Sequence, residues 1–233
     1  DGHLVQLVTV QMRERGGVAK ALFDMGLAAA KARRLALAEG RKDLWASARF
    51  HVADAVVFSK IRKRFGGRLL GILSGSATLN ADVCWFFHDV GLPAYDCYGL
   101  TETSPAVTMN STLGFEPGTV GRPVDGVKVV IDTSVVDDGG QDGEVVVYGP
   151  NVMKGYHNKP EQTAAVLTDD GGFRTGDRGV LSENGYLRIT GRIKEQYKLE
   201  NGKYVFPATL EEDIRRVAGI ANAVVYGAGR PFN

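Results

Sequence analysis

The stretch Tyr98-Gly99-Leu100-Thr101-Glu102-Thr103-Ser104-Pro105 decides how this 233-residue chain is interpreted. It follows an apolar, strand-like run over Gly91–Cys97 and then loses the pattern of a strand. It brings an aromatic ring, a glycine, a hydroxyl and a carboxylate together within a few residues. A threonine hydroxyl can donate to a phosphoryl oxygen, and a carboxylate suits a hard cation such as Mg2+. The stretch therefore predicts a corner that binds a nucleotide and a metal, with a plain polar loop after a buried strand as the alternative.

The composition is that of an ordinary globular protein, with 44% hydrophobic and 24% charged residues. The length is sufficient for one large domain or for parts of two. Cys84 and Cys97 are too few for a disulfide framework, which favours a reducing compartment such as the cytoplasm. No apolar run reaches the roughly 20 residues that span a bilayer.

The net charge of +1 conceals an uneven distribution. Between Arg13 and Arg68 there are 14 Lys and Arg against 5 Asp and Glu, whereas residues 69–233 hold 14 against 21. A basic segment attached to an acidic body indicates an anionic partner, and we expect an anionic membrane face rather than nucleic acid. The alternative is a solvated helix face that contacts nothing.

The first half of the chain has the pattern of an α/β unit. Apolar residues recur at helical spacing through Val18, Leu22, Met25, Ala29, Ala32 and Leu35, which predicts an amphipathic helix over 18–37. A second helix is expected over 44–65, because basic residues precede Gly66-Gly67 there. Further along we expect a strand over 69–73 covered on both faces, a small-residue loop over 74–79, a helix capped by Asn80, and a strand over 94–98.

The second half has mostly the pattern of β structure. We expect strands over 127–131 and 144–148, a short helix from Pro160, and a hairpin over 179–190 that turns at 183–185. A strand over 194–199, a helix over 207–217 and a last strand over 223–226 complete the pattern. The predicted organisation is an α/β part over 1–118 with a basic helical insert at about 13–68, a β-rich subdomain over 119–193, and a further small domain that begins at 194.

Four ordered motifs carry a family resemblance: the Tyr98–Pro105 stretch, Phe173–Asp177, Gly191–Glu195, and Asn201–Pro207 with Leu210-Glu211. Together they resemble the adenylate-forming (ANL) superfamily of acyl-CoA synthetases, luciferases and nonribosomal-peptide adenylation domains. The resemblance implies an α/β fold: the three-layer, parallel-sheet portion of a large adenylation domain, then a mostly β subdomain and the start of a small α+β lid. The basic helices and the Arg64–Arg68 junction are most similar to long-chain fatty acyl-CoA synthetases.

The resemblance also implies roles for individual residues. Tyr98, followed by Gly99, matches the residue that stacks on adenine, and Asp177 and Arg192 match the residues that hold the ribose. Thr101 matches a contact to the α-phosphate, and Glu102 matches the carboxylate that holds Mg2+; these two are the expected catalytic residues. Lys194 matches the hinge of the lid. The remaining adenine-site positions are expected at Gly75, Ser76, Ala77 and Asp96.

The function that this resemblance implies is ATP- and Mg2+-dependent activation of a fatty acid, followed by transfer to coenzyme A. The family's phosphate loop and its C-terminal lysine match nothing in these residues, so we expect the chain to be an inactive internal fragment of such a ligase. An acyl-carrier-protein ligase or aryl-CoA ligase of the same superfamily is an alternative. A non-catalytic nucleotide-binding module is an alternative of another class.

Overall fold

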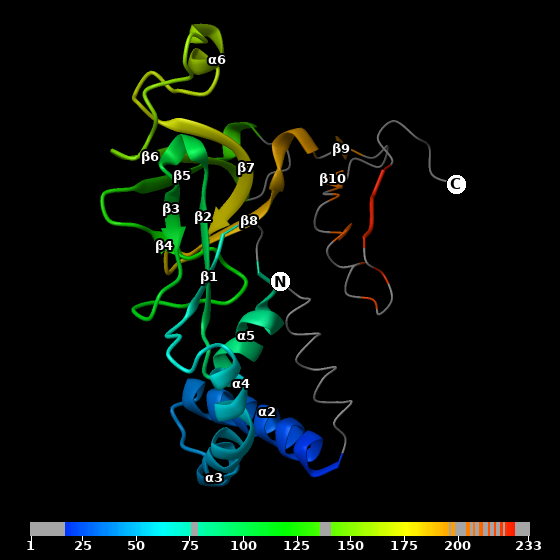
Figure 1. Ribbon diagram of the computed structural model, residues 1–233. Helices are drawn as coiled ribbons and strands as arrows, with labels where there is room; N and C mark the ends of the chain where they lie inside the picture. The colour runs from blue at the N-terminus through cyan, green and yellow to red at the C-terminus, as the bar shows by residue number, and fades with distance from the viewer. Residues whose placement is uncertain are drawn as a thin grey trace. The chain divides into compact units, whose positions relative to one another are not determined.

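The computed structural model describes residues 17–75, 79–135 and 141–195, together with 197–198, 204–205, 207, 210–211, 214, 217, 220 and 222–226. The chain divides into two compact units, 1–96 and 97–233, and each is described here by itself. The chain contains both helices and strands, so the α/β class predicted from the sequence is confirmed (Figure 1). The predicted boundaries at 118 and 193 stay predictions.

The described part of the first unit begins with a helical cluster, which runs from blue to cyan in Figure 1. It consists of α2 (Gly17–Ala38), α3 (Leu44–Ala53), a π-helical turn (Asp54–Phe58) and α4 (Ser59–Arg64). Asp43 caps α3 by accepting a hydrogen bond from the backbone N of Ala46 at 2.8 Å. Both predicted basic helices are therefore present, and the second is interrupted by the π turn. None of the described helices is long and apolar enough to cross a membrane.

The buried face of α2 differs from the predicted stripe. Val18 and Leu35 are exposed, whereas the buried residues are Phe23, Gly26, Ala29, Ala30 and Ala36. The reason is a close helix contact at Gly26, where an added Cβ would lie 2.5 Å from the Ala53 Cβ. Small residues let the helices approach, so the buried face combines small side chains with the hydrophobic Phe23.

The rest of the first unit contains β1 (Ile72–Ser74), α5 (Ala81–Asp89) and the first half of β2 (Ala94–Gly99). β1 pairs in parallel with Ala94–Asp96, and Asn80 caps α5 as predicted, by accepting from the backbone N of Asp82 at 2.7 Å. The prediction that the first strand is covered on both faces is wrong for this structure, because Leu73 is 65% exposed. β1 is the terminal strand of its sheet, so it has a strand neighbour on one side alone among the described residues.

The second unit is dominated by strands. The second half of β2 pairs with β3 (Ala106–Met109), which pairs with β4 (Arg122–Pro123), both antiparallel. A separate four-stranded antiparallel sheet has the order β5 (Lys128–Asp132), β6 (Gly143–Tyr148), β7 (Phe173–Leu181) and β8 (Leu187–Arg192). The short helix α6 (Pro160–Ala164) begins at the predicted proline, and β7 and β8 form the predicted hairpin.

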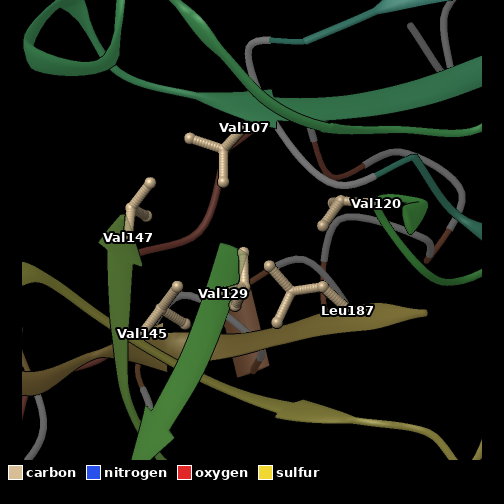
Figure 2. Close-up of a cluster of buried hydrophobic side chains, with 6 residues drawn as sticks. All are labelled: Val107, Val120, Val129, Val145, Val147 and Leu187. Atoms are coloured by element: carbon tan, nitrogen blue, oxygen red, sulfur yellow. The ribbon is translucent and has the colours of Figure 1, made fainter. Parts of the chain in front are cut away.

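One hydrophobic cluster holds these strands together. Figure 2 shows its six side chains, which come from β3, β5, β6, β8 and the loop before β4: Val107, Val120, Val129, Val145, Val147 and Leu187. All are buried, and the partly buried ring of Tyr98 packs against the cluster. The second half of β2 is thus anchored to the same core as the β5–β8 sheet.

Beyond Arg192 the structure differs from the predicted elements in two places. Ile193–Glu195 forms a 3-10 turn rather than the start of the strand expected over 194–199, and within that range the structure describes β9 (Tyr197–Lys198), which pairs with β10 (Tyr204–Val205). The strand expected over 223–226 is wrong, because residues 222–226 have no regular structure. Most of the helix expected over 207–217, and the apolar segment at 4–10, lie outside the described residues.

Candidate functional site

Three predicted site residues meet around one carboxylate in the second unit. Tyr98 donates a hydrogen bond from its hydroxyl to Oδ2 of Asp177 at 2.6 Å. Arg192 lies opposite Asp177 on β8, and its Nε is 3.0 Å from Oδ1. The sequence separates these residues by up to 94 positions, and the strands bring them together. The convergence expected from the motifs is therefore present, while the nucleotide roles of the three residues stay predictions.

The two partners of Asp177 differ in exposure: Tyr98 is half-buried and packs against the hydrophobic cluster, whereas Arg192 is exposed. Asp177 is 5% exposed, whereas the side chain of Arg192 is 60% exposed at the end of its strand. Burial, the negative charge of Asp177 and the hydrogen bond to it raise the pKa of Tyr98 well above its usual value. Tyr98 is therefore a fixed, neutral donor, and Arg192 is the partner that can move aside for a ligand.

The turn after Tyr98 is shaped by residues that sequence patterns did not single out. Thr103 is buried, and its hydroxyl oxygen accepts from the backbone N of Leu100 at 2.9 Å. Asn151 donates to the carbonyl oxygens of Thr103 and Ala106 at 3.0 and 2.8 Å. These bonds fix the loop between β2 and β3 at both ends. Thr101 is the first residue of the 3-10 turn within this loop, and its side chain is exposed.

Gly99 has a structural reason to be glycine. An added Cβ would lie 1.6 Å from the carbonyl oxygen of Pro105, so no side chain fits. The close return of the chain at Pro105 is therefore what requires glycine here. Ser104 completes the turn in the left-handed conformation, with φ of 58°.

Glu102, the predicted metal ligand, has a partner that the sequence did not reveal. Tyr156 donates from its hydroxyl to Oε1 of Glu102 at 2.9 Å, and the Met153 backbone N donates to the Glu102 carbonyl oxygen at 2.8 Å. Gly155, the residue before Tyr156, has φ of 146°, and an added Cβ there would lie 2.7 Å from Cγ2 of Thr163. No local signal pairs residues 54 positions apart, so sequence reasoning missed Tyr156.

The remaining predicted site residues belong to other parts of the chain. Asp96 is buried in the first unit and accepts from the backbone N of Leu79, the last residue of the expected small-residue loop, at 2.6 Å. Gly75 is exposed, and Ser76 and Ala77 lie outside the described residues. Lys194 is exposed in the 3-10 turn after β8, where the predicted hinge stays a prediction.

The donor sets fit a nucleotide and Mg2+. An ionised carboxylate offers about four lone-pair positions, so Asp177 can accept two further hydroxyl groups beside Tyr98 and Arg192. Oε2 of Glu102 has no hydrogen-bond partner among the described residues, which leaves it for a cation. Mg2+ in proteins is usually held by one or two carboxylates together with phosphate oxygens and waters. The arrangement can therefore hold a ribose at one carboxylate and a metal at the other.

Comparisons with known proteins agree with this chemistry. A family model described as AMP-binding enzyme matches residues 18–157, which is more than half of the chain. The chain is 39% identical over 193 residues to a long-chain-fatty-acid–CoA ligase, FadD15, of Mycobacterium bovis, and covers 31% of its length. It is 34% identical to long-chain-fatty-acid–CoA ligase 5 of Rattus norvegicus, of which it covers 27%. The chain thus spans about a third of the curated relatives it matches.

Solved structures give the same result for the fold. A chimera of RpMatB and BxBclM with bound ATP is 34% identical, with a TM-score of 0.61 over 76% of this chain and 36% of the other. The o-succinylbenzoate coenzyme A synthetase MenE of Bacillus subtilis, in complex with ATP and magnesium ion, is 28% identical. Its TM-score is 0.59, over 68% of this chain and 34% of the other.

Proposed function

We infer the function from one premise: the chain belongs to the AMP-binding enzyme family. We propose that the protein containing it activates a fatty acid with ATP and transfers the acyl group to coenzyme A. The names of the relatives support the fatty acid and the thiol acceptor. The observation that carries the proposal is the Asp177 carboxylate, held by Tyr98 and Arg192 in a geometry suited to a ribose.

The proposed reaction has two steps. An oxygen of the fatty acid carboxylate attacks the α-phosphorus of ATP. The new O–P bond forms as the bond from the α-phosphorus to the bridging oxygen breaks, and pyrophosphate leaves. The thiolate of coenzyme A then attacks the acyl carbon, and AMP leaves as the thioester forms. Catalysis of such steps depends on positioning and on stabilisation of charge on phosphoryl oxygens. Mg2+, when bound, supplies positive charge at those oxygens.

The residues of this chain divide the positioning between them. Asp177 and Arg192 bind the ribose, and the ring of Tyr98 lies beside the adenine. Thr101 donates to the α-phosphate from its exposed place in the turn. Glu102 would hold Mg2+ through the oxygen that Tyr156 leaves unused. Lys194 serves as the point about which a following domain rotates.

An acid panel tests the proposal. The longer parent enzyme, meaning this chain with the regions that its relatives have beyond the match, is assayed for pyrophosphate release with ATP and acids of different length. We expect turnover with long-chain fatty acids and a loss of about 100-fold in Asp177→Ala, since a carboxylate holding the ribose is removed. Asp125→Ala is the control, because Asp125 is exposed in the loop before β5.

Other outcomes of the same assay separate the alternatives. Activity with aryl acids alone, as the similarity to MenE allows, favours an aryl-CoA ligase. Transfer to a carrier protein instead of coenzyme A favours a carrier-protein ligase. Nucleotide binding without pyrophosphate release with any acid contradicts the enzyme proposal and favours a binding module.

We also propose that this protein is cytoplasmic and binds peripherally to an anionic membrane through its helical cluster. Trp45 is 79% exposed on α3, and Arg49 and Val52 follow it at helical spacing on the same face. Exposed Arg41 and Lys42 precede that face. Aromatic and aliphatic side chains beside cations are typical of helices that lie in the membrane interface.

Vesicle co-sedimentation of the parent enzyme tests this association. Each cation near an anionic surface contributes roughly 1 kcal/mol, so binding should fall steeply as salt rises. Trp45→Ser should weaken binding, whereas Leu113→Ser, at an exposed apolar residue of the second unit, is the control. Equal binding to neutral and anionic vesicles, unaffected by salt, contradicts the proposal.

A further inference from the structure

The strand that carries Asp177 contains a bulge immediately before it. Glu144 of β6 pairs with Arg178 of β7, and Val146 pairs with Arg174. A step of two residues on β6 therefore spans a step of four on β7, and the extra residues lie within 175–177. Gly176 sits in this bulge with φ of 71°, a conformation that favours glycine. Bulges of this kind re-aim a side chain next to them, and here that side chain is Asp177.

A bulge removes backbone groups from the ladder, and side chains satisfy them here. The backbone N of Gly176 donates to Oε1 of Glu144 at 3.1 Å. The backbone N of Asp177 donates to the hydroxyl oxygen of Thr175 at 3.1 Å, and that hydroxyl donates to the Val145 carbonyl oxygen at 2.8 Å. A buried N–H group without a partner is costly, so these contacts hold the bulge in one conformation.

Glu144 is a buried carboxylate whose two oxygens have different tasks. Oε1 receives the Gly176 N–H, while Oε2 lies 2.5 Å from Nη1 of Arg174. The other end of the same guanidinium, Nη2, lies 3.0 Å from Oδ2 of Asp132. A buried charge needs such a partner, and the planar fork of arginine suits two carboxylates at once. Arg174 thereby fixes the carboxylate that fixes the bulge.

We propose that Glu144 is a positioning residue for nucleotide binding. It acts through the Gly176 backbone to hold the bulge that directs the Asp177 carboxylate toward the ribose. This inference rests on the proposed function in so far as Asp177 binds the nucleotide. A purely structural role for Glu144 would instead lower stability and impair the kinetics with ATP and with the fatty acid equally.

Asp132 provides the matched control for this distinction. It pairs with the same arginine, yet it otherwise accepts hydrogen bonds from the Ser134 backbone N and hydroxyl, and among the described residues it has no hydrogen bond with the bulge. Asp132→Asn therefore weakens the same ion network without removing the acceptor for Gly176. Glu144→Gln keeps the shape of the side chain and one acceptor oxygen, whereas Glu144→Ala removes the acceptor.

The experiment has two readouts in the parent enzyme. The first is steady-state pyrophosphate release, which gives separate KM values for ATP and for the fatty acid. We expect Glu144→Ala to raise the KM for ATP by about 10- to 100-fold, the loss typical of one buried hydrogen-bond acceptor, with the fatty acid KM within about 2-fold of wild type. Glu144→Gln should show a smaller rise, and Asp132→Asn should remain near wild type.

The second readout is hydrogen exchange at residues 173–181 without any ligand. Exchange at Gly176 should be faster in Glu144→Ala than in Asp132→Asn. The proposal is overturned if exchange at the bulge is unchanged, if Asp132→Asn reproduces the ATP effect, or if both KM values rise equally. A wild-type parent without fatty-acid-dependent activity contradicts the proposed function instead, and the exchange data still decide whether Glu144 holds the bulge. If Glu144→Ala does not fold, Glu144→Gln is judged by the same criteria.

Discussion

Replacing Tyr98 by phenylalanine removes one atom from the centre of the site. The ring remains packed against the hydrophobic cluster, so apolar burial changes little. The hydroxyl that donates to Oδ2 of Asp177 at 2.6 Å is lost. Hydrogen bonds to charged groups contribute about 1.5–3 kcal/mol, and Asp177 is buried. We therefore expect Tyr98→Phe to lower the free energy of unfolding of the second unit by that amount at pH 8.

The pH dependence of this difference follows from the raised pKa of Tyr98. An unfolded tyrosine ionises near pH 10, whereas folded Tyr98 stays neutral at that pH. The contribution is fully present below about pH 10 and is lost above it, by up to about 1.4 kcal/mol per pH unit. Phenylalanine has no such loss, so wild type and Tyr98→Phe should approach equal stability between about pH 11 and 12.

Urea unfolding of the chain, followed by circular dichroism at pH 8 and pH 11, measures this difference. Both tryptophans, Trp45 and Trp85, belong to residues 1–96, so their fluorescence follows the first unit and should change little. Tyr186→Phe is the control: Tyr186 is buried, and its hydroxyl has no carboxylate partner among the described residues. A Tyr98→Phe difference that is negligible at pH 8, or equally large at pH 11, refutes the reasoning.

Three further changes have defined outcomes. Gly121→Ala should destabilise the second unit by more than about 4 kcal/mol in urea unfolding, because its Cβ would lie 1.9 Å from the Met109 carbonyl carbon. The control is Gly185→Ala: this glycine has φ of 77° but open space around it, so the substitution should destabilise by about 1–2 kcal/mol. Gly26→Ala should destabilise the helical cluster by about 1–3 kcal/mol, since it forces α2 away from Ala53. Urea unfolding followed by tryptophan fluorescence measures this, and an unchanged unfolding midpoint contradicts the close packing. Residues 1–233 alone should release no measurable pyrophosphate, because the family's phosphate loop and lysine match nothing here. Losing even one electrostatic contact of this kind lowers the catalytic rate by about 100- to 1000-fold. Fatty-acid-dependent turnover that disappears in Glu102→Ala would contradict this prediction.

Features that depend on neighbouring residues could be predicted from the sequence. The cap at Asn80, the proline that starts α6 and the hairpin between β7 and β8 each rest on contacts within a few positions. The buried face of α2 could not be predicted in the same way. Its partner approaches at Gly26, and hydrophobic periodicity gives a glycine no weight, although glycine permits the closest packing.

In the candidate site, too, the sequence could identify residues that stand in local motifs but not the distant residues that hold them. Tyr98, Glu102, Asp177 and Arg192 could be named because they stand in motifs that resemble those of a known family. The residues that hold them could not: Glu144 and Tyr156 act over 32 and 54 positions, respectively, and stand in segments whose pattern indicates only a strand and a loop. A hydrogen bond between distant segments leaves no periodicity in either of them, so it appears only once the strand register is known.

The two carboxylates of the site differ in how firmly they are held, and this difference matches their proposed tasks. Asp177 is buried between a neutral phenol and a guanidinium, and its backbone is fixed by a satisfied bulge. Glu102 is half-buried, with one hydroxyl donor to one oxygen. A ribose has the same shape throughout adenylation, so a preorganised acceptor suits it. Glu102 would hold Mg2+ through the carboxylate oxygen that has no hydrogen-bond partner among the described residues, and a carboxylate held at one oxygen alone is suited to adjust to a cation.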